Sequence, residues 1–201
     1  MIREFYLSGP LSEGKPAYAG QGRLPGALRT LLAQWNGVFA YAGALVILPS
    51  GTSRACWTME ELNAGAWRAA YPEATEAWFF AVDAVGHPFG ILDDAVVRLD
   101  PETGAVARLH EEWDGFLAAV EAEPNRTARL HLFEAWVSTG KTLGLRDRIV
   151  PDMPFCEGGG RAISAYHAED LMLFLDLSAR RHARLRTSGE PASGAPSSDA
   201  N

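Results

Sequence analysis

The first apolar pattern along the chain has the period of a helix. Between residues 25 and 35, leucine and tryptophan recur at spacings of three and four, which gives one apolar face. These positions are Leu24, Leu28, Leu31, Leu32 and Trp35. Pro25 suits a first helical turn, and Asn36-Gly37 suits a helix end because glycine tolerates the left-handed conformation found there. The pattern predicts a helix over residues 25–35.

A strand and a second helix are predicted next. Residues 44–48 are continuously apolar and are closed by a Pro-Ser-Gly sequence, which is typical of a buried strand. Thr58 and Glu61 have the spacing of a capping box, in which each side chain bonds the backbone N–H of the other residue. We therefore predict a helix from Thr58 to about Ala70.

Short β-rich runs alternate with turn residues in the middle of the chain. The runs lie at 78–82, 89–92, 95–99 and 105–109. The turns between them are rich in Asp, Gly and Pro, residues that favour tight turns. Connections this short join neighbouring antiparallel strands, so the pattern predicts a four-stranded meander.

A helix is predicted directly after the meander. Apolar residues at 113, 116, 117 and 120 follow the i, i+3, i+4, i+7 spacing of a helix that lies on a sheet. Acidic residues at 111, 112 and 114 favour its N-terminus through the helix dipole. We expect one core between the meander and this helix. Its members would be Trp78, Phe80, Phe89, Leu92, Leu99, Phe116 and Leu117.

The last third of the chain is less regular. Residues 127–138 have one apolar side and predict a helix, whereas 139–160 are rich in loop-forming residues. Residues 168–181 predict an apolar-faced helix that ends in several arginines. Residues 188–201 contain only small and polar side chains plus proline, so this tail cannot bury enough surface to offset its ordering entropy and is expected to be disordered.

Composition and charge restrict the class of protein. The chain has 201 residues and a net charge of −7, which argues against a nucleic-acid-binding protein but is compatible with a basic protein partner. No segment has the roughly 20 apolar residues of a membrane span, and the N-terminus lacks the apolar stretch of a signal peptide. We therefore expect a cytoplasmic protein whose two cysteines, Cys56 and Cys156, are thiols rather than a disulfide.

The usual catalytic motifs are absent from the sequence. There is no Gly-x-Ser-x-Gly nucleophile elbow. Gly140-Lys141-Thr142 matches the end of a phosphate-binding P-loop, but Ala135 stands where that loop needs glycine, so Gly140 is interpreted as a helix stop. Gly158-Gly159-Gly160 does not join a strand to a helix and is interpreted as a plain turn.

The histidines do not predict a metal centre. No two of the five are spaced i, i+4 on one predicted helix. His167 with Glu169 and Asp170 could form a carboxylate–imidazole group, but an acidic helix N-terminus explains the same residues. His87 lies between Asp83 and Asp93 in the sequence, and a hairpin turn accounts for all three. We expect no metal and no cofactor.

Some aromatic and acidic residues are candidates for a protein-contact surface. Trp57, Trp67 and Trp136 are interpreted as core residues, with an exposed contact role as the alternative. Seven acidic residues follow the meander turns, either as ordinary turn chemistry or as a surface for a cationic partner. The seven are Asp83, Asp93, Asp94, Asp100, Glu102, Glu111 and Glu112. The best candidates for partner contacts are Asp93, Asp94, Glu111 and Glu112.

The order of these segments resembles the SUKH superfamily, of the SMI/KNR type. The resemblance covers residues 24–121, about half of the chain. The segments that carry it are LPGALRTLLAQWNG, ALVILP, TMEELNAG, EAWFFAVDAVGHPFGI and AVVRLDPETGAVARLHEEWDGFLAAV. The later segment RIVPDMPFCEGG is similar to an extension that follows this domain in some bacterial members.

The resemblance implies an α+β fold, with an antiparallel-to-mixed sheet and flanking helices. We expect a single SUKH-like domain at 24–121, preceded by an N-terminal extension at 1–23. A C-terminal helical extension at 122–187 would pack on the core and lead into the tail at 188–201. The role of the N-terminal extension and the oligomeric state stay open.

The resemblance also implies a non-catalytic protein-binding module. In its most concrete form this is an immunity protein that neutralises a polymorphic secreted toxin, whose domain would be basic. A SUKH-type adaptor or regulator without a toxin partner is the alternative, and an enzyme with an unrecognised site is a third reading.

Overall fold

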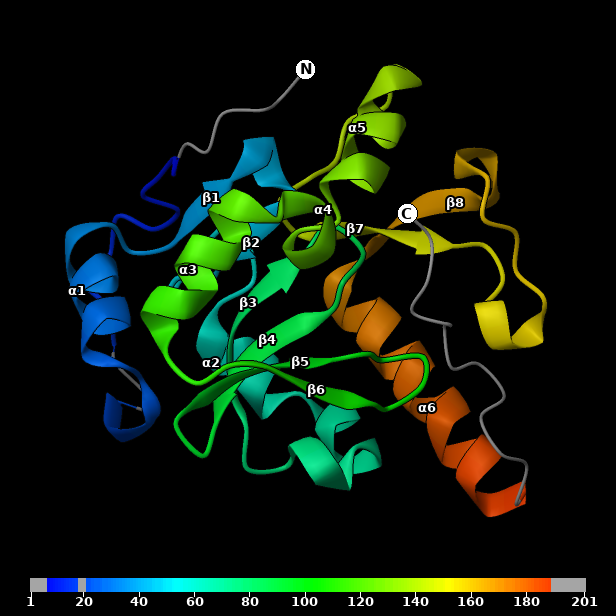
Figure 1. Ribbon diagram of the computed structural model, residues 1–201, viewed down its shortest axis with the longest axis horizontal. Helices are drawn as coiled ribbons and strands as arrows, with labels where there is room; N and C mark the ends of the chain where they lie inside the picture. Colours follow the sequence, from blue (N-terminus) through cyan, green and yellow to red (C-terminus); the bar gives the residue numbers. More distant parts are fainter. Residues whose placement is uncertain (1–6, 18–20, 189–201) are drawn as a thin grey trace.

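The centre of the molecule is a six-stranded sheet in which every neighbouring pair of strands is antiparallel. It is seen in a computed structural model that describes residues 7–17 and 21–188. The strands follow the sequence order β1-β2-β3-β4-β5-β6. They are β1 (Val38–Ala40), β2 (Leu45–Ile47), β3 (Trp78–Asp83), β4 (Pro88–Leu92), β5 (Ala95–Leu99) and β6 (Val106–His110). The predicted meander is confirmed, and β1 and β2 extend it (Figure 1).

Six α-helices and a separate hairpin complete the described part of the chain. The helices are α1 (Gly26–Gln34), α2 (Met59–Ala64), α3 (Trp113–Ala122), α4 (Pro124–Thr127), α5 (Leu130–Ser138) and α6 (Leu171–Ser188). The hairpin pairs β7 (Asp147–Pro151) with β8 (Tyr166–Asp170). Short 3₁₀ turns are η1 (Gln21–Arg23), η2 (Tyr41–Gly43), η3 (Ala66–Ala70), η4 (Pro72–Ala74), η5 (Phe155–Glu157) and η6 (Ile163–Ala165). The α+β class expected from the sequence is therefore confirmed.

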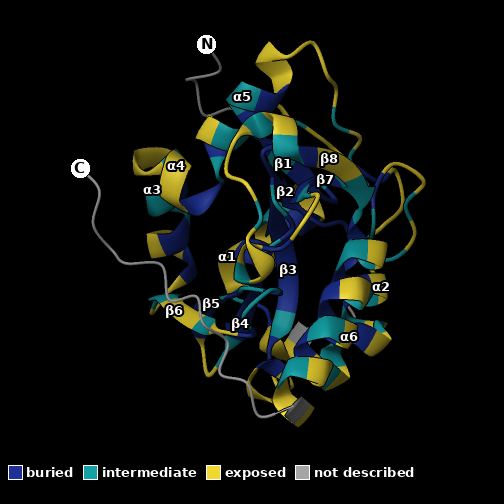
Figure 2. Ribbon diagram, turned by 90° about the vertical axis from the view of Figure 1, so that its right-hand side faces the viewer, coloured by how far each residue is buried: buried dark blue, intermediate teal, exposed yellow. Residues whose placement is uncertain are grey.

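Helices cover both faces of the sheet, so the central strand is buried on both sides. Figure 2 shows α3 on one side of β3, and α2 and α6 on the other. From β3, Phe80 packs edge-on against Phe116 of α3, with ring centroids 5.7 Å apart. Phe79 meets Trp67 of η3 on the opposite face, at 5.5 Å. This two-sided burial explains why residues 79–82 are continuously apolar rather than alternating.

The predicted core lies between the sheet and α3. Phe80, Phe89, Leu99 and Phe116 are fully buried. The three other predicted members, Trp78, Leu92 and Leu117, are half-buried and pack against this core from its margin. A β-bulge between Phe79 and Ala81 leaves Phe80 as the extra residue of β3, and its ring packs against Phe116 of α3.

The helix predicted from Thr58 is shorter than expected. Its capping box is present: Thr58 Oγ1 accepts from the Glu61 N–H at 3.2 Å, and the Thr58 N–H donates to Glu61 at 2.9 Å. The helix stops at Ala64 because Gly65 adopts an extended conformation, with φ −61° and ψ 134°, and the indole of Trp67 lies against it. The chain then continues as the 3₁₀ turn η3 instead of an α-helix.

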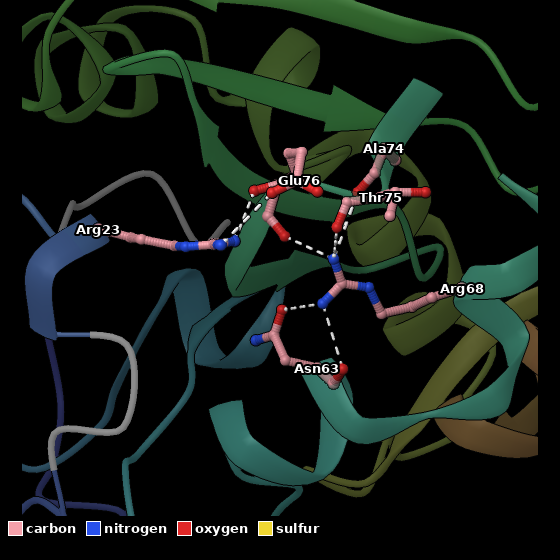
Figure 3. Close-up of polar contacts among 7 residues, drawn as sticks. Arg23, Asn63, Arg68, Ala74, Thr75 and Glu76 are labelled. Carbon is pink, nitrogen blue, oxygen red and sulfur yellow. Dashed lines mark hydrogen bonds and ion pairs between the residues drawn. The ribbon is translucent and has the colours of Figure 1, made fainter. Parts of the chain in front are cut away.

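Arg68 holds the segment after this break in place (Figure 3). One terminal nitrogen donates to the backbone and side-chain oxygens of Asn63, at 3.1 and 2.9 Å. The other donates to the carbonyls of Thr75 and Ala77, at 2.6 and 2.7 Å. Burial lowers the pKa of Arg68, and nearby Arg23 lowers it further. Arg68 therefore joins the end of α2 to the start of β3.

Two expectations for the last third of the chain are wrong. The helix expected over 127–138 is broken at Arg129, which has a left-handed backbone (φ 54°) and separates α4 from α5. The region 139–160 is mostly loop, as expected, but it also contains β7, which the sequence pattern does not predict. Residues 168–170, expected to begin a helix, belong to β8, and α6 starts at Leu171. The C-terminal extension is thus not purely helical: β7 and β8 satisfy each other's backbone groups, a long-range pairing that local periodicity does not reveal.

The described part of the N-terminal segment lies along the outer edge of β1. Ser8 pairs with Phe39 in an isolated bridge, and the N–H of Leu11 donates to the Gly37 carbonyl at 3.0 Å. Leu11 is buried in the main core. Residues 1–6 and 18–20 of the expected extension, and 189–201 of the expected tail, lie outside the described residues, so the expectation of a disordered tail is not addressed.

Candidate functional site

The acidic residues of the meander separate into two groups at opposite ends of the sheet. In a meander, successive turns fall at alternate ends of the strands. The β3–β4 turn, with Asp83, and the β5–β6 turn, with Asp100 and Glu102, share one end. The β4–β5 turn and the link from β6 to α3 share the other end. A single surface made by all seven predicted acidic residues is therefore excluded.

The four residues proposed as partner contacts gather at this second end and are all exposed; they are Asp93, Asp94, Glu111 and Glu112. Asp93 and Asp94 are the two central residues of the hairpin and have φ of 49° and 62°. Positive φ at both positions is the requirement of a type I′ turn, which aspartate tolerates. Glu112 precedes α3 in an extended conformation. We call these four residues the acidic patch.

The acidic patch borders a shallow depression with an apolar floor. This depression, of about 340 Å³, is lined by Asp94, Glu111 and Glu112 together with four apolar residues. The apolar residues are Leu24, Pro25, Ile91 and Trp113. Arg108 lies beside the patch and forms a two-point pair with Glu111, with N–O distances of 3.1 and 2.6 Å. Four carboxylates and one guanidinium leave this surface clearly negative.

A buried carboxylate lies at the opposite end of the sheet. Asp83 is fully buried; its Oδ1 accepts from the N–H groups of Val85 and His87, at 3.0 and 2.9 Å. Its Oδ2 lies 3.1 Å from His87 Nδ1 and 4.0 Å from Arg129 Nε. Burial alone would raise the pKa of Asp83, but His87 and Arg129 outweigh it, and the pKa lies below its ordinary value. The sequence interpretation of Asp83 and His87 as one hairpin turn is confirmed, whereas Asp93 belongs to the other end.

Beside this turn lies a much larger hollow, which we call the α6 cleft. It measures about 670 Å³. Its walls come from four separate parts of the chain: α6, the β7–β8 hairpin with its connecting loop, the β5–β6 turn, and the β3–β4 turn with the start of α5. No local sequence pattern predicts a site assembled from such distant segments. Several residues singled out in the sequence do line it, among them His87, Asp100, Glu102, His167 and Glu169.

His167 lies on a wall of the α6 cleft and not at a helix N-terminus. Its Nδ1 is 2.8 Å from Asp152 Oδ1, and its Nε2 is 3.8 Å from Glu169. Asp170, expected in the same group, instead caps α6: its Oδ1 accepts from the Met172 N–H at 2.9 Å. Within residues 7–17 and 21–188, no three His, Cys, Asp or Glu side chains are grouped so that they could hold a metal ion.

The glycine-containing motifs have structural roles. Gly140 follows the end of α5 with φ 80°, and its N–H bonds to Val137, which confirms the helix stop. Lys141 lies over the Trp136 ring at 4.3 Å from its centroid. Gly158, with φ 92°, ends η5, which confirms a turn. A Cβ at Gly159 would collide with the backbone of Met153, so this turn requires a residue without a side chain.

The structure also shows where the three tryptophans considered as contact residues and both cysteines lie. Trp67 and Trp136 are buried, and Trp57 is half-buried beneath the guanidinium of Arg146, 3.7 Å from its ring centroid. Both cysteines are free thiols, as expected. Burial raises the pKa of the Cys56 thiol, which makes it unreactive.

These features define the chain as an α+β protein with a sheet covered on both faces, an exposed acidic patch at one end and a large cleft at the other. Each helix in the described part of the chain is too short or too polar to cross a membrane. No protein-family model matches the chain. No curated protein matches it either.

A solved structure shares the fold. The crystal structure of Atu4351 from Agrobacterium tumefaciens superposes with a TM-score of 0.63. The match covers 87% of this chain and 85% of that one, at 12% sequence identity. At this identity the likeness shows a common fold and nothing about activity.

Proposed function

We propose that this chain is a non-catalytic protein-binding module of the SUKH type that neutralises a secreted toxin as an immunity protein. The observation that carries the binding role is the acidic patch, where two turns bring exposed carboxylates to the rim of an apolar depression. The resemblance of residues 24–121 to SUKH proteins supports the choice of a toxin as partner. The chain's net charge of −7 favours a basic toxin domain.

The chemistry of the patch specifies what such a partner presents. An arginine or lysine side chain can lay its methylene groups on the floor formed with Pro25 and Trp113, while its charged end meets Asp94 or Glu112. A two-point contact from arginine would be the stronger of the two. Glu111 is already paired with Arg108, so Asp93, Asp94 and Glu112 supply the charge available to a partner.

Two other functions remain alternatives. An adaptor or regulator of the same fold would use the same patch on a partner that is not a toxin. An enzyme is favoured by one feature: Asp83 orients His87 at the α6 cleft, as a carboxylate orients a general base. Among the described residues, however, no hydroxyl or thiol group is hydrogen-bonded to His87, so the pair lacks a nucleophile to activate.

Co-expression with a secreted toxin whose gene lies beside the gene of this chain tests the proposal, followed by binding kinetics at low and high salt. A charge-neutralised patch variant keeps the turn intact, because asparagine tolerates positive φ as aspartate does. It carries Asp93→Asn, Asp94→Asn and Glu112→Gln. A control variant removes the same charge from exposed residues away from the patch. It carries Glu13→Gln, Glu73→Gln and Glu121→Gln.

We expect the unaltered chain to bind and to rescue growth. The patch variant should associate about tenfold more slowly at low salt, with a smaller difference at high salt, because such charges act mainly on the rate of encounter. The control variant should associate almost normally. Equal slowing in both variants would remove the patch from the interface. A chain that neither binds nor rescues would overturn immunity to that toxin and favour the adaptor.

A further inference from the structure

The α6 cleft is lined by a tyrosine whose ring is buried and whose hydroxyl group opens into the cleft. Tyr166 on β8 is only 5% exposed and lines the cleft. Within the described part of the chain, its hydroxyl makes no hydrogen bond. The hydroxyl is therefore accessible from the cleft and free to donate a hydrogen bond to a ligand there.

Two arginines, Arg129 and Arg161, line the same cleft as Tyr166. Burial raises the pKa of Tyr166; Arg161 opposes this, Glu102 adds to it and Arg129 opposes it. Across residues 7–17 and 21–188, Arg161 has no carboxylate within ion-pair distance, and Arg129 reaches Asp83 only at 4.0 Å. Tyr166, with a raised pKa, remains a hydrogen-bond donor at neutral pH.

The carboxylates of the cleft are occupied by other contacts. Glu102, which also acts on Tyr166, accepts from the Cys156 N–H at 2.6 Å. Asp100 accepts from two N–H groups of its own turn, at 2.9 and 3.3 Å. Asp152 bonds His167, and Glu169 accepts from the Asp170 N–H at 3.0 Å. Within the described part of the chain, the Arg161 guanidinium and the Tyr166 hydroxyl are therefore cleft donors left without an acceptor.

An apolar wall adjoins these donors. The ring of Phe155 lies 6.4 Å from that of Tyr166, and the guanidinium of Arg161 stands over the same phenyl ring, 5.8 Å from its centroid. Phe155 is 43% exposed, and Leu177 on α6 is 47% exposed. Both line the cleft. Phe174 also lines it and packs against Gly86 in the β3–β4 turn. Large apolar side chains left uncovered inside a cleft are typical of ligand sites.

We propose that the α6 cleft binds a small organic anion, in which a carboxylate or phosphate group is attached to an aromatic or branched apolar body. The anionic group accepts from Tyr166, Arg161 and Arg129. The apolar body lies against Phe155 and Leu177. The cleft's volume, about 670 Å³, falls within the range of about 300–1,000 Å³ that small-molecule sites occupy. The acidic patch is at the other end of the sheet, so this site is independent of the proposed protein interface.

A fluorescent probe tests this site directly. The probe 8-anilinonaphthalene-1-sulfonate combines an anionic group with an aromatic body, and N-phenyl-1-naphthylamine is its counterpart without the charge. Both are titrated against the full chain and three variants. Arg161→Gln removes the charge, Tyr166→Phe removes only the hydroxyl, and Arg29→Gln is the matched control on the exposed face of α1. Near-ultraviolet circular dichroism verifies that each variant is folded.

We expect one saturable site for the anionic probe. Arg161→Gln should weaken its binding about tenfold and Tyr166→Phe about threefold or more, because charge-assisted hydrogen bonds are lost. Arg29→Gln should leave the affinity within about twofold, and the neutral probe should bind all variants alike. Phenyl phosphate and phenylacetate, added as competitors, then distinguish a phosphate from a carboxylate ligand.

Three results would overturn the proposal. The first is binding of the anionic probe that does not saturate. The second is equal weakening by Arg161→Gln and Arg29→Gln. The third is a loss of neutral-probe binding in Tyr166→Phe as large as the loss of anionic-probe binding, since this would show that the hydroxyl acts only on packing. Tyr166→Phe keeps the test decisive if Arg161→Gln fails to fold.

Discussion

The imidazole of His182 on α6 stacks on the ring of Tyr71, with centroids 5.1 Å apart and planes inclined by 25°. The same imidazole fills the space beside Gly104, where any Cβ would collide with it. Tyr71 in turn donates to the Pro101 carbonyl at 2.7 Å. His182 therefore packs the second half of α6 against the β5–β6 turn. The protonation state of His182 is expected to change the stability of that contact.

This contact predicts a loss of stability on mild acidification. Burial lowers the pKa of His182, and nearby Arg186 lowers it further, while Glu73 opposes them. The unfolded chain then binds the proton more readily than the folded one, so the contribution is complete above about pH 6.5 and declines below it. Urea unfolding at pH 7.5 and 5.5 should show a smaller decrease for His182→Phe than for the unaltered chain. An identical decrease in both would contradict the prediction.

Asp83→Asn should be strongly destabilising, by about 3–5 kcal/mol, since removing one partner of a buried charged group leaves the others uncompensated. His87 and Arg129 would lose the carboxylate that they contact, and buried Arg148, whose pKa burial lowers to about 10, would lose a favourable interaction. Urea unfolding at pH 7 measures the effect. Asp94→Asn, at an exposed turn position whose positive φ asparagine tolerates, is the control and should change stability by less than about 0.5 kcal/mol.

The same carboxylate predicts an acid limb of stability. Because the folded-state pKa of Asp83 is depressed, its contribution is present above the unfolded value of about 3.9 and is lost as pH falls through the folded value. Stability measured across pH 5 to 2 should fall less steeply in Asp83→Asn than in the unaltered chain. Parallel curves would show that Asp83 keeps an ordinary pKa.

Phe116→Ala should cost about 3–5 kcal/mol, from lost burial and the cavity left behind. Phe116 is fully buried, and its ring meets those of Phe80, Phe89 and Trp113, at 5.7, 5.3 and 5.5 Å. Leu117→Ala, one position along the same helix but half-buried, should cost less. Thermal melts of the two variants make the comparison, and a loss below about 1 kcal/mol for Phe116→Ala would remove it from the core.

Arg68→Lys should destabilise the chain by about 2 kcal/mol, although it keeps the charge. The guanidinium of Arg68 bonds Asn63 with one terminal nitrogen and the Thr75 and Ala77 carbonyls with the other. The single ammonium group of lysine cannot reach both sets of acceptors at once. Arg23→Lys is the matched control. Arg23 bonds Glu76 at the surface, and exposed pairs of this kind contribute about 0–1 kcal/mol. Equal losses in chemical denaturation would show that the Arg68 contacts add nothing beyond charge.

Much of the fold follows from local patterns in the sequence. Apolar spacing, the Thr58–Glu61 capping box and the turn residues of the meander act over a few positions, so the sequence alone predicts α1, β2 to β6 and α3. The antiparallel order of the strands follows from the short turns. That order even assigns the acidic residues to two ends of the sheet, because successive turns of a meander alternate between ends.

Tertiary contacts decided the rest. Trp67 and Arg68 stop a helix that propensity would continue, and the pairing of β7 with β8 overrides the helical pattern at residues 168–170. Arg148, buried on β7, hides that strand from any apolar pattern. The acidic patch could be predicted because its residues lie in two turns with visible charge. The grouping of Arg129, Arg161 and Tyr166 could not be predicted, because it depends on how α5, the β7–β8 hairpin and α6 pack together. Side chains so far apart in the sequence meet only once the chain has folded.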